Sequence, residues 1–342
     1  MKSFYVELTG VGKSELKEEE IAFEDLKDDE AIIQMEYSMI SAGTELSRAY
    51  GLKKGFSYPV RPGYCGVGRI VSKGKDIKPE VGDRVFFNAP HASLVRWSSG
   101  KDVQDPLIMK IDEDIDPVEA TAINLCLVAL QGVNLSEVKL GYTVGVFGLG
   151  NIGIMAALMY KKLGCKVIGF DLVKERCALA EAMGLEYTCF EDYGNKVKEL
   201  SDGKGLDICV DATGSSKVIA ECMDHVGRYG QVILLGSPRQ SYEADLMPVF
   251  SKMHMKNIRV IGAFNKTIPV YETDGSVDCM ERNLSVIMDL MRKKDIDIRK
   301  LITKIIDPKD CQEAYYDLMY KKDECNAIVY DWRKYVDKAL DS

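Results

Sequence analysis

The sequence predicts an α/β protein with two domains: a β-rich first domain and a second domain built on a doubly wound parallel sheet. Three observations lead to this prediction. The chain has 342 residues, which is too long for one ordinary hydrophobic core. Short apolar runs separated by Gly, Pro and Asp fill its front part. Farther along, apolar runs alternate with helical stretches, which is typical of a parallel sheet covered on both faces.

The composition excludes several classes of protein. Hydrophobic residues make up 46% of the chain and charged residues 29%, the balance of a folded protein. The net charge of −8 argues against a nucleic-acid partner, because phosphate contacts need a basic surface. The N-terminal residues lack the apolar segment of a secretion signal, and no apolar run is long enough to span a bilayer. We therefore expect a cytoplasmic protein that acts on a small-molecule substrate, with no nucleic-acid or membrane partner.

The cysteines indicate neither a disulfide framework nor a metal site. Ten cysteines are scattered along the chain without a Cys-x-x-Cys pair, and the only histidines are His91, His225 and His254. In a cytoplasmic protein such cysteines stay reduced and pack as small apolar side chains. We predict no bound metal.

The first domain is expected to span residues 1–122 and to consist mostly of strands. Strand candidates lie at residues 31–35, 68–71 and 84–87, each bounded by turn-forming residues. Gly82 and Asp83 supply the bend that leads into the third of these strands.

The second domain is expected over residues 123–265. A helix is predicted from Pro117 to Val133, because proline is tolerated in the first turn of a helix. The strands predicted after it lie at 143–148, 166–171, 206–211, 231–235 and 259–262.

The remaining residues, 266–342, are expected to return to the first domain, because their last apolar run lies too far from the alternating series to extend it. The elements predicted there are a helix at 276–294, a strand at 301–306, a helix at 308–319 and a strand at 327–330.

A Gly-x-Gly-x-x-Gly motif follows the strand at 143–148 and opens a helix. Gly148 permits the tight turn, Gly150 lets the backbone approach a pyrophosphate, and Gly153 lets the helix pack closely on the sheet. Asn151 and Ile152 begin the helix, whose N-terminal N–H groups attract phosphate. The motif therefore predicts a dinucleotide-binding (Rossmann) domain.

The ends of the other strands extend this predicted cofactor site. Asp171 ends the second strand, where an acidic side chain binds the adenosine ribose and disfavours a 2′-phosphate, so NAD is favoured over NADP. The nearby Arg176, like Lys174, would partly offset that preference. Loops after two later strands should also line the cofactor, although an ordinary turn is the alternative for each; they contain Ala212, Thr213, Gly214, Gly236 and Ser237.

Taken together, these features resemble the medium-chain dehydrogenase/reductase superfamily, the alcohol dehydrogenase-like proteins, over nearly the whole chain. The resemblance implies a GroES-like β-barrel as the catalytic domain, a Rossmann domain, and a homo-dimer or homo-tetramer. It also implies that Ala263 and Phe264 lie at the nicotinamide end of the cofactor. The motifs that carry it, besides the glycine motif, are Gly43-Thr44-Glu45, residues 62–68, residues 81–85, Leu301-Ile302-Thr303 and Glu313-Ala314-Tyr315.

The chain departs from the zinc-dependent members of this superfamily at their ligand positions. Ala42 stands where they have a cysteine ligand, and Tyr64 where they have a histidine ligand. The third ligand is expected near Ile123, where none stands unless Cys126 reaches the site, and the four-cysteine lobe is missing. A zinc site needs three protein ligands, so we predict a member that works without zinc.

Without zinc, a side chain must exchange the proton of the reaction. The resemblance places Tyr64, Thr44 and Glu45 near the substrate, and His91 in a loop near it; His91 also titrates in a useful range. Each has a structural alternative: a packed tyrosine, a helix-capping threonine, a Glu45 that pairs with a residue such as Arg48, and an exposed loop histidine.

Three functions remain open on this basis. The first is NAD-dependent, zinc-independent interconversion of a secondary alcohol, sugar-like or polyol-like, and a ketone, because a polar set of side chains suits a polyhydroxylated substrate. The second is NAD(P)H-dependent reduction of quinones or enones. The third is a catalytically silent NAD-binding sensor, which would keep the glycine motif and lose turnover.

Overall fold

The computed structural model describes residues 1–52, 55, 57–99, 107–238, 242–272 and 278–335. The chain forms two compact units. The first comprises Met1–Asn124 and Leu301–Ser342, and the second comprises Leu125–Lys300. Among the described residues, no helix combines the length and the apolar character needed to cross a bilayer.

The first unit is built mainly on antiparallel strands, and three of them contain the strands predicted at residues 31–35, 68–71 and 84–87. A two-stranded sheet pairs β1 with β2, and a larger sheet has the order β14-β15-β3-β4-β5-β7, with β6 also paired to β3. The elements of the first unit are β1 (Lys2–Gly10), β2 (Lys13–Glu20), β3 (Glu30–Met39), α1 (Ala42–Ala49), β4 (Gly66–Lys73), β5 (Arg84–Phe87), β6 (Leu94–Ser98), β7 (Ile108–Lys110), α2 (Pro117–Ala120), β14 (Ile302–Ile306), η3 (Pro308–Asp310), α10 (Cys311–Tyr320), β15 (Ala327–Asp331) and η4 (Arg333–Tyr335). The short 3₁₀ helix η2 (Ile298–Lys300) is the last element of the second unit.

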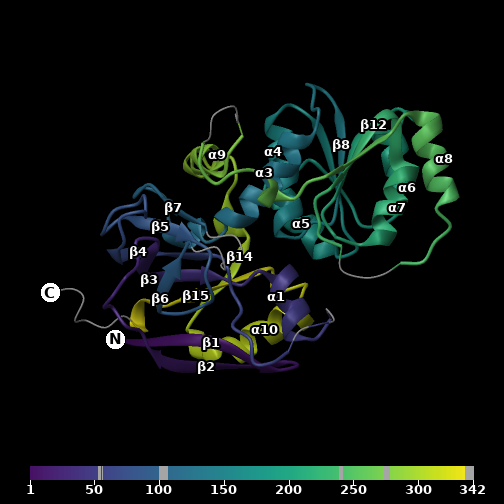
Figure 1. Ribbon diagram of the computed structural model, residues 1–342. Helices are drawn as coiled ribbons and strands as arrows, with labels where there is room; N and C mark the ends of the chain where they lie inside the picture. The colour runs from purple at the N-terminus through teal and green to yellow at the C-terminus, as the bar shows by residue number, and fades with distance from the viewer. Residues whose placement is uncertain (53–54, 56, 100–106, 239–241, 273–277, 336–342) are drawn as a thin grey trace. The chain divides into compact units, whose positions relative to one another are not determined.

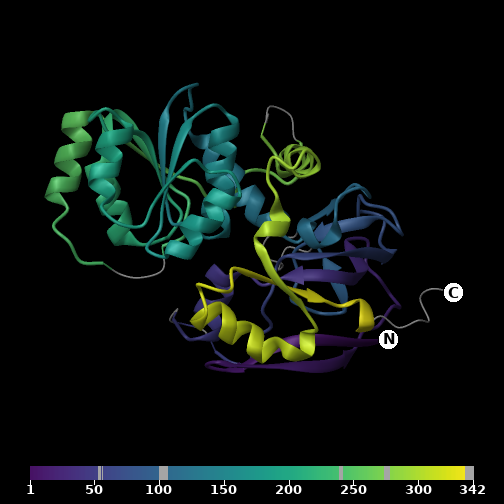
Figure 2. The same ribbon diagram turned by 180° about the vertical axis from the view of Figure 1, so that it is seen from behind.

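The C-terminal segment completes this unit. β15 pairs with β14 on one side and with β3 on the other, where Val329 lies opposite Met39. α10 packs against β2, and Figure 2 shows the yellow C-terminal elements beside the purple N-terminal strands. The predicted return of the chain to its first domain begins at Leu301.

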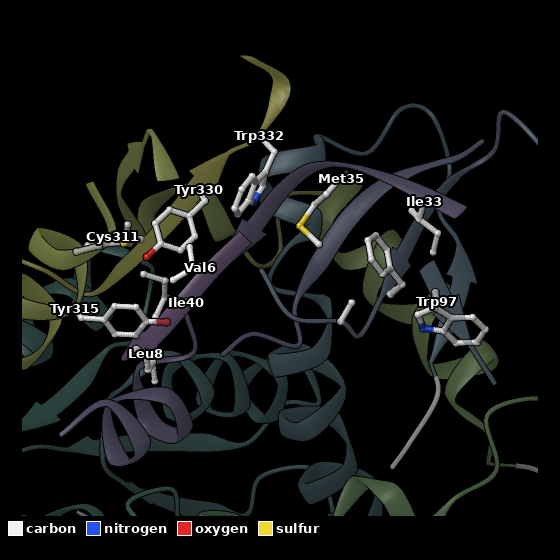
Figure 3. Close-up of a cluster of buried hydrophobic side chains, with 14 of the residues drawn as sticks. Val6, Leu8, Ile33, Met35, Ile40, Trp97, Cys311, Tyr315, Tyr330 and Trp332 are labelled. Atoms are coloured by element: carbon white, nitrogen blue, oxygen red, sulfur yellow. The ribbon is translucent and has the colours of Figure 1, made fainter. Parts of the chain in front are cut away.

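The core of the first unit joins residues from both ends of the chain. Val6 and Leu8 from β1 are fully buried, as are Tyr330 and Trp332 from the last strand and the residues after it. Figure 3 shows these side chains in one cluster with Met35. Each large apolar side chain buried in this way contributes roughly 1.5–3 kcal/mol of transfer free energy, so the C-terminal segment is part of this unit's core.

The second unit is a parallel sheet with helices on both faces (Figure 1). Its strand order is β10-β9-β8-β11-β12-β13, which is the doubly wound order that the glycine motif predicts. Its elements are α3 (Ile123–Leu135), β8 (Thr143–Phe147), α4 (Asn151–Lys162), β9 (Lys166–Phe170), α5 (Lys174–Ala182), β10 (Tyr187–Cys189), α6 (Tyr193–Leu200), β11 (Leu206–Asp211), α7 (Ser216–His225), β12 (Val226–Leu234), α8 (Met247–Lys256), β13 (Arg259–Gly262), η1 (Asn265–Thr267) and α9 (Met280–Arg292).

The strand order reverses beside β8, which has β9 on one side and β11 on the other. In open sheets of this kind, ligands bind outside the carboxyl ends of the strands at such a switch point. The glycine motif comes directly after β8, so it lies at this position.

The structure differs from the predicted domain bounds at the second boundary. Residues 266–300 were expected with the returning segment, but they belong to the second unit. Polar contacts hold them there: the side chains of Asn134 and Asn283 are hydrogen-bonded, and Lys162 pairs with Asp295 at 2.7 Å. The first boundary follows Asn124, close to the predicted residue 122.

Candidate functional site

Two glycines of the motif are required by the packing of the protein itself. Gly148 has a φ of +93°, and a Cβ atom there would lie 2.7 Å from Cγ2 of Thr213. A Cβ atom on Gly153 would lie 1.8 Å from the carbonyl oxygen of Gly148. Any side chain at either position would therefore displace the turn or the helix.

Gly150 differs from the other two, because the protein has no need for a glycine there. Its φ of −72° suits any residue, and a Cβ atom would meet nothing within 4 Å among the described residues. It is the N-cap of α4, which begins with Asn151 and Ile152, and within the described part of the chain no side chain caps this helix. The open space beside the backbone and the positive end of the helix dipole therefore suit a phosphate group.

Asp171 lies at the carboxyl end of β9 and is buried. One of its carboxylate oxygens accepts a hydrogen bond from the backbone N–H of Leu149 at 2.7 Å, and the other accepts from that of Val173 at 2.9 Å. Each oxygen keeps a second lone pair that a ribose hydroxyl can use. The acid thus holds the glycine loop in place and retains the capacity to bind a diol.

Arg176 stands beside this carboxylate, as the sequence suggested. Its Nη1 lies 3.7 Å from Oδ2 of Asp171, and its buried Nε has no hydrogen-bond partner among the described residues. A basic group next to the acid reduces the repulsion that a 2′-phosphate would meet.

The loops after β11 and β12 contact each other. A Cβ atom on Gly214, whose φ is +67°, would lie 2.1 Å from the carbonyl oxygen of Ser237, and one on Gly236 would lie 2.2 Å from the nitrogen of Gly214. The N–H of Ala212 donates to Phe147 at the end of β8. Thr213 packs against Gly148, as described above. The structure therefore brings these predicted residues together with the glycine loop.

Ala263 and Phe264 follow β13 at the same edge of the sheet. The N–H of Ala263 donates to the carbonyl oxygen of Leu234 at 3.1 Å, and its side chain is buried. The ring of Phe264 is 55% exposed. The predicted cofactor residues therefore lie on the loops that follow the carboxyl ends of the strands, or, for Asn151, Ile152, Gly153 and Arg176, in the first turn of the helix after such a loop.

In the first unit, three hydroxyl groups meet at the start of α1. The phenol oxygen of half-buried Tyr64 is in hydrogen-bond contact with Oγ of buried Ser41, and it lies 3.4 Å from Oγ1 of exposed Thr44. Burial raises the pKa of Tyr64 well above its ordinary value. Tyr64 therefore keeps its proton at neutral pH and can donate it.

Glu45 does not face outward with these hydroxyls. Its side chain is fully buried and accepts hydrogen bonds from the Ser41 N–H at 2.8 Å and from the Tyr315 hydroxyl at 2.6 Å. Its other contact is with Nε2 of His91 at 3.0 Å. The prediction that Glu45 binds a substrate hydroxyl conflicts with this burial, because all of these partners are internal.

His91 lies in a loop, as expected, but its side chain is fully buried, so the exposed loop histidine that was its structural alternative is wrong. Its Nδ1 lies 2.8 Å from Oγ of Ser38, which also accepts a hydrogen bond from the indole N–H of Trp332 at 2.8 Å. A Cβ atom on the neighbouring Gly63 would lie 2.6 Å from the His91 nitrogen. The histidine therefore belongs to the interior of the first unit.

The sequence predictions missed four members of these two groups: Ser38, Ser41, Tyr315 and Trp332. Ser41 carried a signal, since it lies in the same turn as Thr44 and directly precedes the helix. Tyr315 and Trp332 carried none, because they approach Glu45 and Ser38 from the far end of the chain.

The residues at the zinc-ligand positions do not form a metal site with others. Among the described residues, no group of three or more His, Cys, Asp or Glu side chains is placed to hold a metal ion. Cys126 is fully buried in the second unit, where its thiol lies 3.0 Å from the sulfur of Met155. Burial raises the pKa of this thiol, which further disfavours the thiolate that a metal would need.

Comparison with known proteins gives a family match for the second unit. Residues 151–282 match the zinc-binding dehydrogenase family. A Haemophilus influenzae protein described as an uncharacterized zinc-type alcohol dehydrogenase-like protein is 23% identical over 250 residues, which cover 64% of this chain and 72% of that protein.

Solved structures match along almost the whole chain. Galactitol-1-phosphate dehydrogenase from Escherichia coli has a TM-score of 0.81 at 17% identity, covering 96% of this chain and 99% of that one. A protein described as a short chain alcohol dehydrogenase from Escherichia coli CFT073, solved with NADH, has a TM-score of 0.79 at 16% identity, with the same coverage. The family match and the shared fold together confirm the predicted resemblance to the medium-chain dehydrogenase/reductase superfamily.

Proposed function

We propose that this chain is an NAD-dependent oxidoreductase that interconverts a secondary alcohol and a ketone without zinc. The observation that carries the proposal is Gly150, where the fold leaves open space against a backbone that has no need of a glycine. That space lies at the switch point of a doubly wound sheet, beside the N-terminus of α4.

The residues present fit a nicotinamide dinucleotide. Gly150 and the first turn of α4 would bind its pyrophosphate, and Asp171 would accept hydrogen bonds from its adenosine ribose. When bound, this group accepts or donates a hydride. The Escherichia coli CFT073 structure with NADH supports the same cofactor class. Asp171 favours NAD over NADP. Arg176, 3.7 Å from Asp171, would make the difference between the two affinities smaller.

Tyr64 is the proposed proton-transfer group. In alcohol oxidation the ionised form of Tyr64 would take the hydroxyl proton as the C=O bond forms, and the hydrogen of the broken carbinol C–H bond would leave with both electrons as hydride to the nicotinamide. In reduction, Tyr64 returns that proton to the carbonyl oxygen. Because burial raises the pKa of Tyr64, the residue is better suited to donate a proton than to accept one at neutral pH.

A polyhydroxylated substrate is the proposed class. Hydroxyl groups at Thr44 and Tyr64 offer partners to a sugar-like or polyol-like molecule, and unpaired polar groups in a binding site are costly. The dehydrogenase from Escherichia coli with a similar fold is named for a polyol phosphate, which supports this choice.

Reduction of a quinone or an enone is the second candidate. Two observations favour it: the raised pKa of Tyr64, which suits reduction, and Arg176 beside Asp171, which eases NADPH binding.

The test is a turnover assay of the purified protein with metal analysis. The substrates are polyols, sugars and simple secondary alcohols with NAD or NADP, and ketones, quinones and enones with NADH or NADPH. We expect NAD-linked turnover of a polyol or ketose without stoichiometric zinc, and a loss of about 100-fold or more in kcat for Tyr64→Phe with unchanged NADH affinity.

Other results would redirect the proposal. One equivalent of zinc that is needed for activity would contradict it. NADPH-linked turnover of quinones alone would favour the second candidate. NADH binding without turnover of any compound would instead support a silent sensor.

A further inference from the structure

The surroundings of the Tyr64 oxygen contain a feature that neither the family match nor the relatives assign. Two hydroxyl groups, those of Ser41 and Thr44, approach this one atom. Both come from the same turn of chain, where the Thr44 N–H donates to the Ser41 carbonyl oxygen at 3.1 Å. Ser41 is buried and Thr44 is exposed, so the pair reaches the phenol oxygen from the interior and from the surface.

Because a phenol has one proton, the reaction determines which of these hydroxyl groups donates a hydrogen bond and which accepts it. Tyr64 has one hydroxyl proton, and to give it to a substrate that proton must point away from Ser41 and Thr44. A serine or threonine hydroxyl can rotate and either donate or accept. Once the Tyr64 oxygen carries negative charge, both neighbours gain by donating to it, since hydrogen bonds to charged groups are the strong ones.

Ser41 is held in position by the buried network behind it. Its N–H donates to Oε1 of Glu45, whose other oxygen contacts the Tyr315 hydroxyl and Nε2 of His91. The side chain of Ser41 can therefore turn toward Tyr64 while its backbone stays fixed. This gives the buried Glu45–His91 pair a positioning role instead of the direct contact with substrate that the sequence suggested.

The groups around the Tyr64 oxygen shift the pKa of Tyr64 in opposite directions. Burial and the nearby Cys65 and Glu45 raise the pKa of Tyr64, whereas the hydrogen bonds with Ser41 and Thr44 lower it. Without the two hydroxyls, the phenol would be a still weaker acid.

We propose that Ser41 and Thr44 act as a pair of hydrogen-bond donors that stabilise the Tyr64 oxygen after it has lost its proton, a role that rests on the dehydrogenase function proposed above. Ser41 is the stronger member, because its contact is the closer one, and it acts through Tyr64 as a positioning residue.

The first test measures the ionisation of Tyr64 without any substrate. A ring-fluorinated tyrosine, which ionises at lower pH, is placed at position 64 alone, and its ¹⁹F shift is followed against pH. One hydrogen bond to a charged oxygen corresponds to about a tenfold change in the ionisation equilibrium. We therefore expect Ser41→Ala to raise the midpoint by about one pH unit and Thr44→Val to raise it by less. Ser41→Thr, which keeps the hydroxyl, should restore it.

The chain offers a matched control in the second unit. Ser136 and Tyr160 are also a buried serine–tyrosine pair in hydrogen-bond contact. Ser136→Ala removes the same kind of contact and should leave the midpoint of position 64 unchanged. If Ser41→Ala leaves this midpoint where it is in the unsubstituted protein, while circular dichroism shows a folded chain, the donor pair is refuted.

The second test uses the pH profile of the oxidation that the substrate panel identifies. At pH values below the midpoint of Tyr64 ionisation, the oxidation rate is proportional to the ionised fraction of Tyr64. Ser41→Ala should therefore lower kcat about tenfold at a fixed pH and shift the profile of kcat against pH to higher pH. Turnover with an unshifted profile would refute the donor pair and leave the dehydrogenase function standing. A shifted ¹⁹F midpoint in a protein that turns over nothing would support the pair and refute the function.

Discussion

At the scale of single residues, the two candidate sites differ in how their side chains are used. Asp171 accepts two backbone hydrogen bonds, and its oxygens keep lone pairs for the ribose that we propose it binds. Every contact described for Glu45 and His91 is internal, so they can affect the chemistry only by positioning Ser41. Asp171, Glu45 and His91 are all candidate functional residues in the sequence, and only their surroundings in the structure distinguish them.

Replacing Asp171 should change the choice of cofactor. Asp171→Asn keeps one of the two oxygens that accept backbone hydrogen bonds and loses the charge, and a hydrogen bond to a charged group contributes about 1.5–3 kcal/mol. We expect NADH to bind roughly tenfold more weakly and NADPH no more weakly than before, as measured by fluorescence titration with both. Arg176→Gln is the control, because it should weaken NADPH only. An unchanged ratio of the two affinities would argue against Asp171 as the discriminating residue.

At the scale of elements, the β8–α4 turn makes separate demands at its glycines. Gly153→Ala would place a Cβ atom 1.8 Å from a backbone oxygen, whereas Gly150→Ala would place one in open space. We expect Gly153→Ala to lower the free energy of unfolding by roughly 1–3 kcal/mol. Gly150→Ala should leave it nearly unchanged and weaken NADH binding at least tenfold. Urea unfolding and NADH titration measure the two effects, and a Gly150→Ala protein that binds NADH normally would contradict the assignment of the loop.

Helix α10 is anchored by an ion-paired acid, Asp317, whose side chain is buried. Burial raises the pKa of this carboxyl, but its hydrogen bonds with Lys304 and Lys321 are stronger together and leave the pKa below its ordinary value. A lowered pKa means that the stabilisation is complete above the pKa of the unfolded chain, near 4, and is lost as pH falls through the lower folded value.

We therefore expect Asp317→Asn to lower the free energy of unfolding by roughly 1 kcal/mol at pH 7, a modest value because both lysines are solvent-exposed. The difference in free energy of unfolding between this variant and the unsubstituted protein should become smaller as the pH is lowered below about 4. Urea unfolding at several pH values measures this; a difference independent of pH would mean that packing, not charge, is responsible.

The sequence predicted most elements of the second unit and fewer of the first. The strands at 206–211 and 259–262 have the predicted bounds. For 206–211 the reason is that most of the strand is buried, and a buried parallel strand is a nearly continuous apolar run. β2, with the sequence KSELKEEE, was not foreseen, since its many charges hide the alternation of a half-buried strand. The environment of His91 could not be predicted either, because Trp332 reaches Ser38 from 294 residues away.

At the scale of the whole molecule, the outer edge of the second unit's sheet has no further strand paired to it among the described residues. β13 ends the strand order, and Val260 on it is 36% exposed. On α8, Met247, Phe250 and Met255 are each at least 60% exposed. Apolar side chains beside an unpaired strand edge favour association with a second copy.

We therefore expect a homodimer or a larger assembly that uses this edge. Phe250→Glu combined with Val260→Lys should reduce the mass measured by light scattering to that of one chain. Leu140→Lys, at a residue that is 85% exposed in another part of the unit, is the control. An unchanged mass in the double variant would place the interface elsewhere.

The path of the chain through the first unit also bears on how the protein is made. The second unit is complete once Lys300 has been synthesised, whereas the first unit still lacks β15, which lies between β14 and β3, until residues 327–331 have been made. Domains generally fold as units during synthesis. We therefore expect a nascent chain to acquire the cofactor-binding unit first. The Glu45 network needs Tyr315, so it would form only after the cofactor-binding unit has been synthesised.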